Sequence, residues 1–203
     1  MKISELSERS GVPVATVKFY IREGMLPRGE AVSATRAEYG DEHLARLRVI
    51  AALADVRGLP LARVRDILEL IDAPSGDPVE TLGRAVGALP PYVTVQRDDY
   101  PLARAAIAEL GLTYDPDFTA VAQLDEALRA LEAAGLDATP AVLRRYGDAM
   151  RQVATDELAP MAGMRLDEAV TYAVLGTALY EPVMLALRRL AHHQLLVVRP
   201  PVG

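Results

Sequence analysis

The stretch ISELSERSGVPVATVKFYIREGML, residues 3–26, contains two short helical patterns separated by a tight turn. Gly11 ends the first pattern and Pro13 opens the second. The second pattern runs to Gly24, because glycine readily adopts the left-handed backbone that ends a helix. Two short helices joined by a turn of about three residues are typical of a helix-turn-helix motif. The sequence therefore predicts this motif at the start of the chain.

The segments that follow predict a small winged domain. Residues 25–40 lack a helical repeat and contain turn-forming residues, which favours a short loop or β-wing. A third helix is expected from Asp41 to about Gly58, and a fourth, opened by Pro60, continues to residue 72.

Composition indicates a mainly α fold. Of the 203 residues, 51% are apolar and 25% are charged, which is typical of a globular chain. Alanine and leucine are abundant, there is no tryptophan, and aromatic residues make up only 5%, so helices are favoured over sheets. The expected fold is an N-terminal winged helix-turn-helix domain followed by an all-α C-terminal domain.

Prolines and small polar residues at 73–78 interrupt the helical pattern and predict a linker. The expected domains are therefore 1–72 and 79–203. The C-terminal domain is expected to hold a short helix ended by Pro90-Pro91 and further helices near 101–110, 119–134, 140–157, 167–179 and 182–193. Pro182 is expected to separate the last two, and the tail 197–203 is expected to be loose.

The net charge of −6 is unevenly distributed along the chain. Residues 1–72 carry 11 Lys and Arg and 11 Asp and Glu, so the acidic surplus lies wholly in 73–203. A local cluster of cations in the N-terminal domain is therefore compatible with a nucleic-acid partner.

The second helix carries hydroxyl-bearing and basic side chains: Thr16, Lys18, Tyr20 and Arg22. Such groups suit base edges and phosphate oxygens, and Val17 and Ile21 are expected to pack inward. Arg28 and Arg36 fall in the expected wing, where they could meet phosphates or the minor groove. Arg57 precedes the start of the fourth helix, whose free amides can hold a phosphate, with simple solvation as the alternative.

Taken together, these segments resemble the MerR-type transcription regulators. The resemblance covers about residues 2–72. Its motifs follow the family's order: Ile3-Ser4-Glu5-Leu6-Ser7, Gly11-Val12, Thr16-Val17-Lys18-Phe19-Tyr20, Arg22-Glu23-Gly24-Met25-Leu26, Arg36, Tyr39 and Gly58-Leu59-Pro60-Leu61.

The resemblance implies a homodimer on a near-palindromic site in double-stranded DNA, with RNA polymerase at the promoter and control by bending and untwisting the spacer. It assigns Thr16, Lys18, Phe19 and Tyr20 to the recognition helix, and Arg28, Arg36 and Tyr39 to the wing and its base. It also implies that the hydroxyls of Tyr20 and Tyr39 hold phosphates. The family's long dimerisation helix is missing after the linker, so dimerisation is assigned to other surfaces of the C-terminal domain.

The composition restricts the kinds of effector that the chain could sense. The chain has no cysteine, which excludes thiolate metal ligands, thiol redox sensing and disulfides, and no metal or cofactor is expected. An organic effector or no effector remains. Seven of the ten aromatic residues could line an effector pocket, although packing within a helical bundle is the favoured interpretation: Tyr92, Tyr100, Tyr114, Phe118, Tyr146, Tyr172 and Tyr180.

The sequence thus predicts a cytoplasmic, homodimeric transcription regulator that is not an enzyme. No nucleophile elbow, Gly-rich phosphate loop or metal-binding helix motif occurs, and neither a signal peptide nor a membrane span is expected. The alternative is a small-molecule-binding or sequestering protein whose N-terminal domain is a vestigial interaction module.

Overall fold

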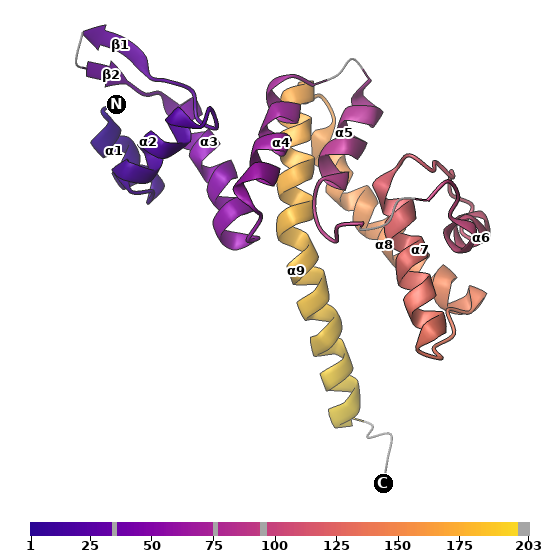
Figure 1. The fold of residues 1–203 in the computed structure, drawn as a ribbon. Helices are drawn as coiled ribbons and strands as arrows, with labels where there is room; N and C mark the ends of the chain where they lie inside the picture. The colour runs from indigo at the N-terminus through magenta and orange to yellow at the C-terminus, as the bar shows by residue number, and fades with distance from the viewer. Residues whose placement is uncertain (34–35, 75–76, 94–96, 199–203) are drawn as a thin grey trace. The chain divides into compact units, whose positions relative to one another are not determined.

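The computed structural model describes residues 1–33, 36–74, 77–93 and 97–198, and its mainly helical fold with one small wing confirms the predicted fold class (Figure 1). Its residues form two compact units, Met1–Glu69 with Leu175–Gly203 and Leu70–Val174. Residues 73–77 of the expected linker 73–78 lie between two helices, Pro78 begins the second of these helices, and residues 75–76 fall outside the described part. The division into domains at this linker stays a prediction.

The first two helices form the helix-turn-helix expected from the sequence. Helix α1 spans Ile3–Ser10 and ends at Gly11, whose φ is +72°. Helix α2 spans Val14–Arg22 and ends in a Schellman motif, in which the Met25 amide donates to the Tyr20 carbonyl at 2.9 Å. Gly24, with φ of +74°, makes the reversal that follows. This reversal directs Met25 into the core, where its side chain is 1% exposed.

A two-stranded antiparallel wing follows, as predicted. Strand β1 spans Glu30–Ser33 and β2 spans Arg36–Glu38, with Glu30 opposite Glu38. The tip, residues 34–35, lies outside the described residues.

The third and fourth helices complete the N-terminal part of this unit. Helix α3 spans Asp41–Ala51 and continues as a π-helical turn, η1, over Ala52–Val56. Helix α4 spans Leu61–Asp72. Helices α1 and α3 are in contact, and the buried side chains of this part form its core: Leu6, Val17, Met25, Leu26, Leu47, Ile50, Leu53, Val64, Ile67 and Leu68.

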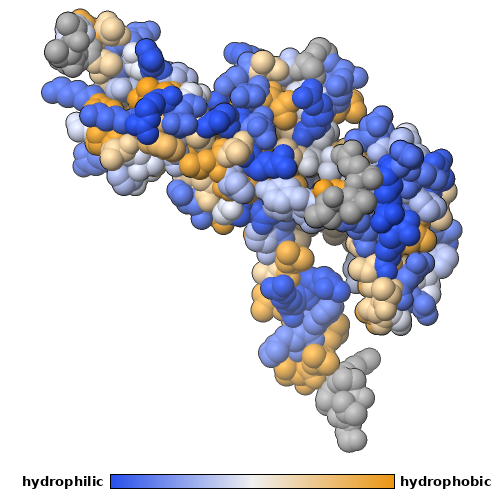
Figure 2. Space-filling view, viewed as in Figure 1, coloured by the Kyte–Doolittle hydropathy of each residue, from blue (hydrophilic) through white to orange (hydrophobic). Residues whose placement is uncertain are grey.

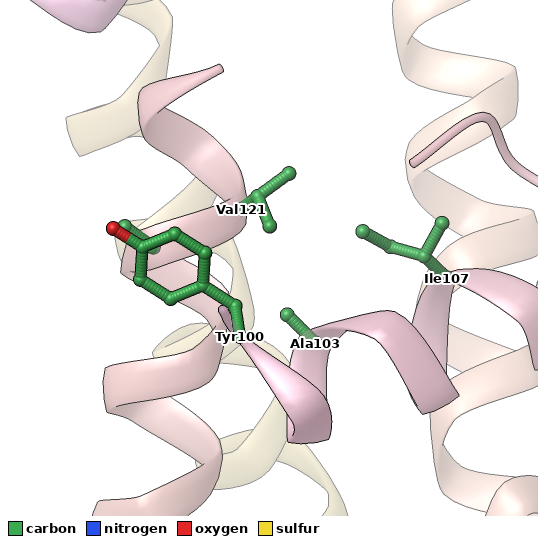
Figure 3. Packing of buried hydrophobic residues seen from close by; sticks show 5 residues of the cluster. Tyr100, Ala103, Ile107 and Val121 are labelled. Atoms are coloured by element: carbon green, nitrogen blue, oxygen red, sulfur yellow. The ribbon is translucent and has the colours of Figure 1, made fainter. Parts of the chain in front are cut away.

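The second unit is built from helices of 9 to 19 residues and a 3-10 turn. Its helices include α5 (Pro78–Gly87), α6 (Pro101–Glu109), α7 (Thr119–Ala133), α8 (Pro140–Leu158) and a 3-10 turn, η2 (Ala159–Met161). Helix α6 packs on α7 and α8, and α5 packs on α7. Figure 3 shows Tyr100, Ala103 and Ile107 lying toward Val121 in the small core between α6 and α7.

A buried carboxylate fixes the start of α6. Asp125 on α7 is 0% exposed and accepts hydrogen bonds from the backbone N–H groups of Leu102 and Ala103, at 2.9 and 3.1 Å. The Nε of Arg129 donates to its other oxygen at 2.7 Å. Asp125 therefore satisfies two amides that the helix itself leaves free, although it lies on a different helix.

The last helix corrects two expectations from the sequence. Helix α9 runs without a break over Leu166–Val198, with Pro182 inside it, so the expected separation at Pro182 is wrong. One proline removes a single backbone hydrogen bond, and the strong helix formers on both sides carry the helix through. Val197 and Val198 are helical rather than loose, and residues 199–203 lie outside the described part.

Candidate DNA-binding surface

The orientation of α2 differs from the predicted one. Val17 is 0% and Tyr20 6% exposed, whereas Ile21 is only half-buried. The inward face therefore combines Val17 with Tyr20, and the expectation that Tyr20 lies on the outer face is wrong. A tyrosine ring can pack inside while its hydroxyl stays at the edge, so its phenol gave no clear signal of direction. Burial and the nearby carboxylate of Asp55 raise the pKa of Tyr20, which keeps its hydroxyl a donor.

The outer face of α2 carries two cations. Lys18 and Arg22 are exposed, one helical turn apart, and Ala15 lies exposed one turn before Lys18. The guanidinium of Arg22 lies 5.3 Å from the centre of the Phe19 ring and 3.6 Å from Glu23, and its side chain is 70% exposed. The sequence does not indicate Ala15 as a residue of the outer face, because the apolar pattern places Ile21 rather than Tyr20 on the inward face.

The remaining predicted residues of α2 lie beside this face. Thr16 and Phe19 are half-buried, so each keeps part of its side chain accessible. Thr16, Lys18, Phe19 and Arg22 therefore share the accessible side of α2, and Tyr20 does not.

Contacts from other helices hold the end of α2 in place. The Nε of Arg46 on α3 donates to the Met25 carbonyl at 2.9 Å. Arg65 on α4 lies 3.3 Å from the carboxylate of Glu23. Neither arginine was singled out in the sequence, since their role depends on helices that meet only in the folded chain.

The wing is attached to the start of the chain. The backbone of Met1 exchanges two hydrogen bonds with Tyr39, at 2.7 and 2.9 Å. Tyr39 is 9% exposed and packs edge-on against His43, so any phosphate contact is limited to the edge of its side chain. Arg28 is exposed just before β1 and makes no ion pair within the described part of the chain. The backbone of Arg36 lies in β2, and its side chain is outside the described residues.

Arg57 forms an ion pair with another residue of the same chain, whereas the sequence had suggested a phosphate contact. Its guanidinium lies 2.8 Å from Glu181 on α9, and the Arg57 side chain is 16% exposed. The structure therefore brings Lys18, Arg22 and their neighbours together on α2, and it engages Arg57 in an ion pair with the C-terminal helix.

The structure also bears on the metal and effector expectations. In the part of the chain that is described, no three His, Asp or Glu side chains gather closely enough to hold a metal ion. Of the aromatic residues named for a pocket, Tyr100 is in the core, whereas Tyr92, Tyr146 and Tyr180 are exposed.

Comparison with known proteins identifies the N-terminal part. Residues 1–71 match the family described as MerR HTH family regulatory protein. A stretch of 73 residues, 36% of this chain, is 30% identical to the HTH-type transcriptional regulator ZntR homolog of Haemophilus influenzae and covers 53% of that protein. The chain thus spans about half the length of this curated relative.

A solved structure resembles the whole chain. The crystal structure of a candidate transcriptional regulator, SCO5550, from Streptomyces coelicolor A3(2) matches with a TM-score of 0.70 and 29% identity, covering 100% of this chain and 99% of that one. The sequence match and the winged fold agree on the same segment. Residues 1–71 are therefore similar in sequence to the MerR HTH family regulatory proteins and form a winged helix-turn-helix.

Proposed function

We propose that the chain is a sequence-specific DNA-binding transcription regulator that acts as a homodimer on a palindromic promoter site. The observation that carries this proposal is the cationic outer face of α2, with Lys18 and Arg22 exposed inside a MerR-type domain. The curated relative named above is a transcriptional regulator and the similar solved structure is a candidate one, and the proposal includes no catalytic role.

The dimensions of α2 suit the major groove. An α-helix with its side chains is about 10–12 Å across, and the groove of B-DNA is about 12 Å wide. In this proposal Lys18 and Arg22 reach base edges or phosphates, and Thr16 and Phe19 contact the groove wall. Arg22 is held by a cation–π contact to Phe19 and a long ion pair, which are weak enough at an exposed site to be exchanged for a guanine or a phosphate.

In this proposal the wing binds the phosphate backbone of the DNA and so positions the protein on the duplex. Arg28 stands exposed where the chain enters β1, and its charge suits a phosphate beside the groove. Arg36 belongs to the same proposed contact set by its position in β2. Tyr20 and Tyr39 are buried, so in this proposal they offer the DNA at most their hydroxyl groups. Arg57 is not among the proposed DNA contacts, because it is paired with Glu181.

The second unit is the proposed input domain. We assign the small organic effector to this unit, where Tyr92 and Tyr146 offer exposed aromatic surface. Contact with RNA polymerase at the promoter and a location in the cytoplasm complete the proposal, and both follow from the regulator role.

Selection from random duplex DNA with the full chain tests this function. The expected product is an inverted repeat whose half-sites lie about 34 Å apart, one turn of B-DNA. Arg28→Ala should lower the salt dependence of binding to that duplex by about 0.9 in log–log slope for each phosphate that the variant no longer neutralises. The matched control is Arg189→Ala, which removes the same charge from α9. Recovery of no enriched sequence would refute the proposal.

A further inference from the structure

The ion pair between Arg57 and Glu181 joins two segments that the DNA contacts proposed above do not use. The Nη2 of Arg57 lies 2.8 Å from the Oε2 of Glu181. Arg57 follows η1 directly, in the connection to α4, and Glu181 lies within α9. Both residues belong to the same compact unit of the chain. The pair is therefore a contact between the DNA-binding part and the C-terminal helix.

This pairing leaves both charged groups incompletely compensated. The Nε of Arg57 is buried and has no hydrogen-bond partner within the described part of the chain, which carries a desolvation cost. Burial raises the pKa of Glu181 by more than the charge of Arg57 lowers it, so lost solvation outweighs the attraction at this carboxylate. Ion pairs withdrawn from water in this way add little net stability. The bond is therefore one that a stronger partner of Arg57 can replace.

Helix α9 is locally weakened at the position of Glu181. Pro182 follows directly and has no N–H, so the carbonyl of Ala178 loses its usual helical donor. Gly176, on the other side of Glu181, is a poor helix former. Bends in long helices concentrate at such residues. A small bend here would move the carboxylate away from Arg57 and leave the rest of α9 helical.

The connection that carries Arg57 lies beside the DNA-binding helix α2. Burial and the charge of Asp55 on η1 both raise the pKa of Tyr20 on α2, which places Asp55 near the tyrosine hydroxyl. Arg65 on α4 lies 3.3 Å from Glu23, just after the end of α2. When a helix lies in the major groove, the elements that flank it face the phosphate backbone along the groove. A released Arg57 would therefore have phosphates as alternative partners.

Glu181 is the single acidic residue in the part of α9 that belongs to this unit. Residues 175–198 contain two arginines and no other Asp or Glu. Figure 2 shows a mixture of apolar and hydrophilic surface on the end of this helix. A chain that loses the bond to Glu181 therefore has no second acid on this part of α9 to hold Arg57.

We infer that Glu181 limits DNA binding, because it occupies Arg57 in the DNA-free chain and must be displaced by a phosphate of the bound duplex; this rests on the proposed function, which supplies a duplex at α2. Carboxylate and phosphate oxygens are both strong acceptors for a guanidinium, so they compete for the same group. Binding then costs the free energy of the broken pair, which lowers the affinity of the wild-type chain for DNA. The DNA-free structure is the state in which Arg57 is withheld.

Titration of the Glu181→Gln protein against the selected duplex tests this competition. The variant keeps the shape of the side chain and loses its charge, so it should bind about fivefold more tightly than wild type. The matched control Glu69→Gln removes the same charge from an exposed position on α4 in the same unit. It should change the affinity by less than about twofold. Circular dichroism checks the fold of both variants, and equal affinity of wild type and Glu181→Gln would overturn the inference.

Variants of Arg57 distinguish a phosphate contact from a structural effect of the ion pair. Arg57→Gln should reduce the steepness of the log–log salt dependence of binding by about 0.9, and adding Glu181→Gln to it should give no gain in affinity. Exchange of the two charges, by Arg57→Glu with Glu181→Arg, restores an ion pair without the phosphate contact, so DNA binding should stay weak. Rescue of wild-type affinity by this exchange would show that the pair is purely structural.

A duplex of mixed sequence separates this competition from the proposed function. Phosphates are common to all duplexes, so Glu181→Gln should bind this duplex more tightly than wild type does as well. If selection enriches no sequence while this gain persists, the sequence-specific function fails and the competition between Glu181 and phosphate stands. If a sequence is enriched and Glu181→Gln shows no gain on it, the competition is refuted and the function stands.

Discussion

The guanidinium of Arg57 and the carboxylate of Glu181 lie 2.8 Å apart, joining the winged part of the chain to α9 across 124 positions of sequence. Their side chains are 16% and 31% exposed. The pair holds the end of η1 to α9.

The first prediction concerns the strength of this pair. Arg57→Ala and Glu181→Ala should each destabilise the chain, because each leaves a partly buried charge without its partner. The double variant should be destabilised by less than the sum, with a coupling energy of about 1–2 kcal/mol. Urea unfolding of the four proteins measures this coupling. Additive effects would show that the pair contributes nothing beyond two separate side chains.

The second prediction concerns pH. Burial raises the pKa of Glu181 above its ordinary value of 4.5, and the charge of Arg57 lowers it only in part. Between the ordinary and the raised value, the folded chain binds more protons at this site than the unfolded chain, so this site's contribution to the unfolding free energy falls as pH rises. Glu181→Gln should remove that fall, seen as the difference between the two pH profiles. Parallel profiles for wild type and variant would contradict the assignment.

The third prediction concerns the wing. A Cβ added at Gly29 would lie 2.6 Å from the backbone oxygen of Glu38 and 3.0 Å from the Tyr39 ring. Gly29→Ala should therefore displace β2, weaken DNA binding and cost about 1–3 kcal/mol in stability. The control is Gly176→Ala on α9, where a Cβ meets open space and should stabilise the helix by up to about 1 kcal/mol. Thermal unfolding and DNA titration check both, and an unaffected Gly29→Ala protein would argue against the tight packing of the wing.

The fourth prediction concerns the second unit. Asp125→Ala should cost about 2–4 kcal/mol, because it removes the acceptor of two amides at the start of α6 and the partner of Arg129. Asp125→Asn keeps one oxygen acceptor and should be clearly less destabilising. Urea unfolding compares them. Equal destabilisation in the two variants would mean that the carboxylate acts through its charge rather than as an acceptor.

Much of the N-terminal unit could be predicted from local sequence. Gly11 and Gly24 end their helices with a left-handed backbone, and the wing falls where helical periodicity stops. The inward face of α2 was assigned wrongly, since Ile21 is more apolar than Tyr20 and the pattern alone favoured it. Burial of Tyr20 depends on the helices that surround it, which no local pattern specifies.

Features that depend on distant parts of the chain could not be predicted either, because local patterns do not specify tertiary contacts. Pro182 is a strong local signal for a helix end, yet α9 continues through it. The partner of Arg57 lies far along the chain, so the residue looked like a phosphate ligand beside the start of α4. The apolar residues in the last turns of α9 resemble those of a core helix in sequence, but the fold leaves Val183, Leu187 and Leu190 exposed within the chain.

Titration of the Lys18→Ala protein against the selected duplex shows whether the outer face of α2 binds a palindromic site. Wild type should bind the full inverted repeat with a Kd of about 10⁻⁸ M or tighter, and a duplex with one scrambled half-site far more weakly. Lys18→Ala should weaken binding to the full repeat by at least about fivefold, since each base or phosphate contact contributes roughly 1–3 kcal/mol, while Arg189→Ala should not. Equal binding of wild type and Lys18→Ala, or wild-type affinity of only about 10⁻⁴–10⁻⁶ M for every duplex, would contradict binding of a palindromic site by this face.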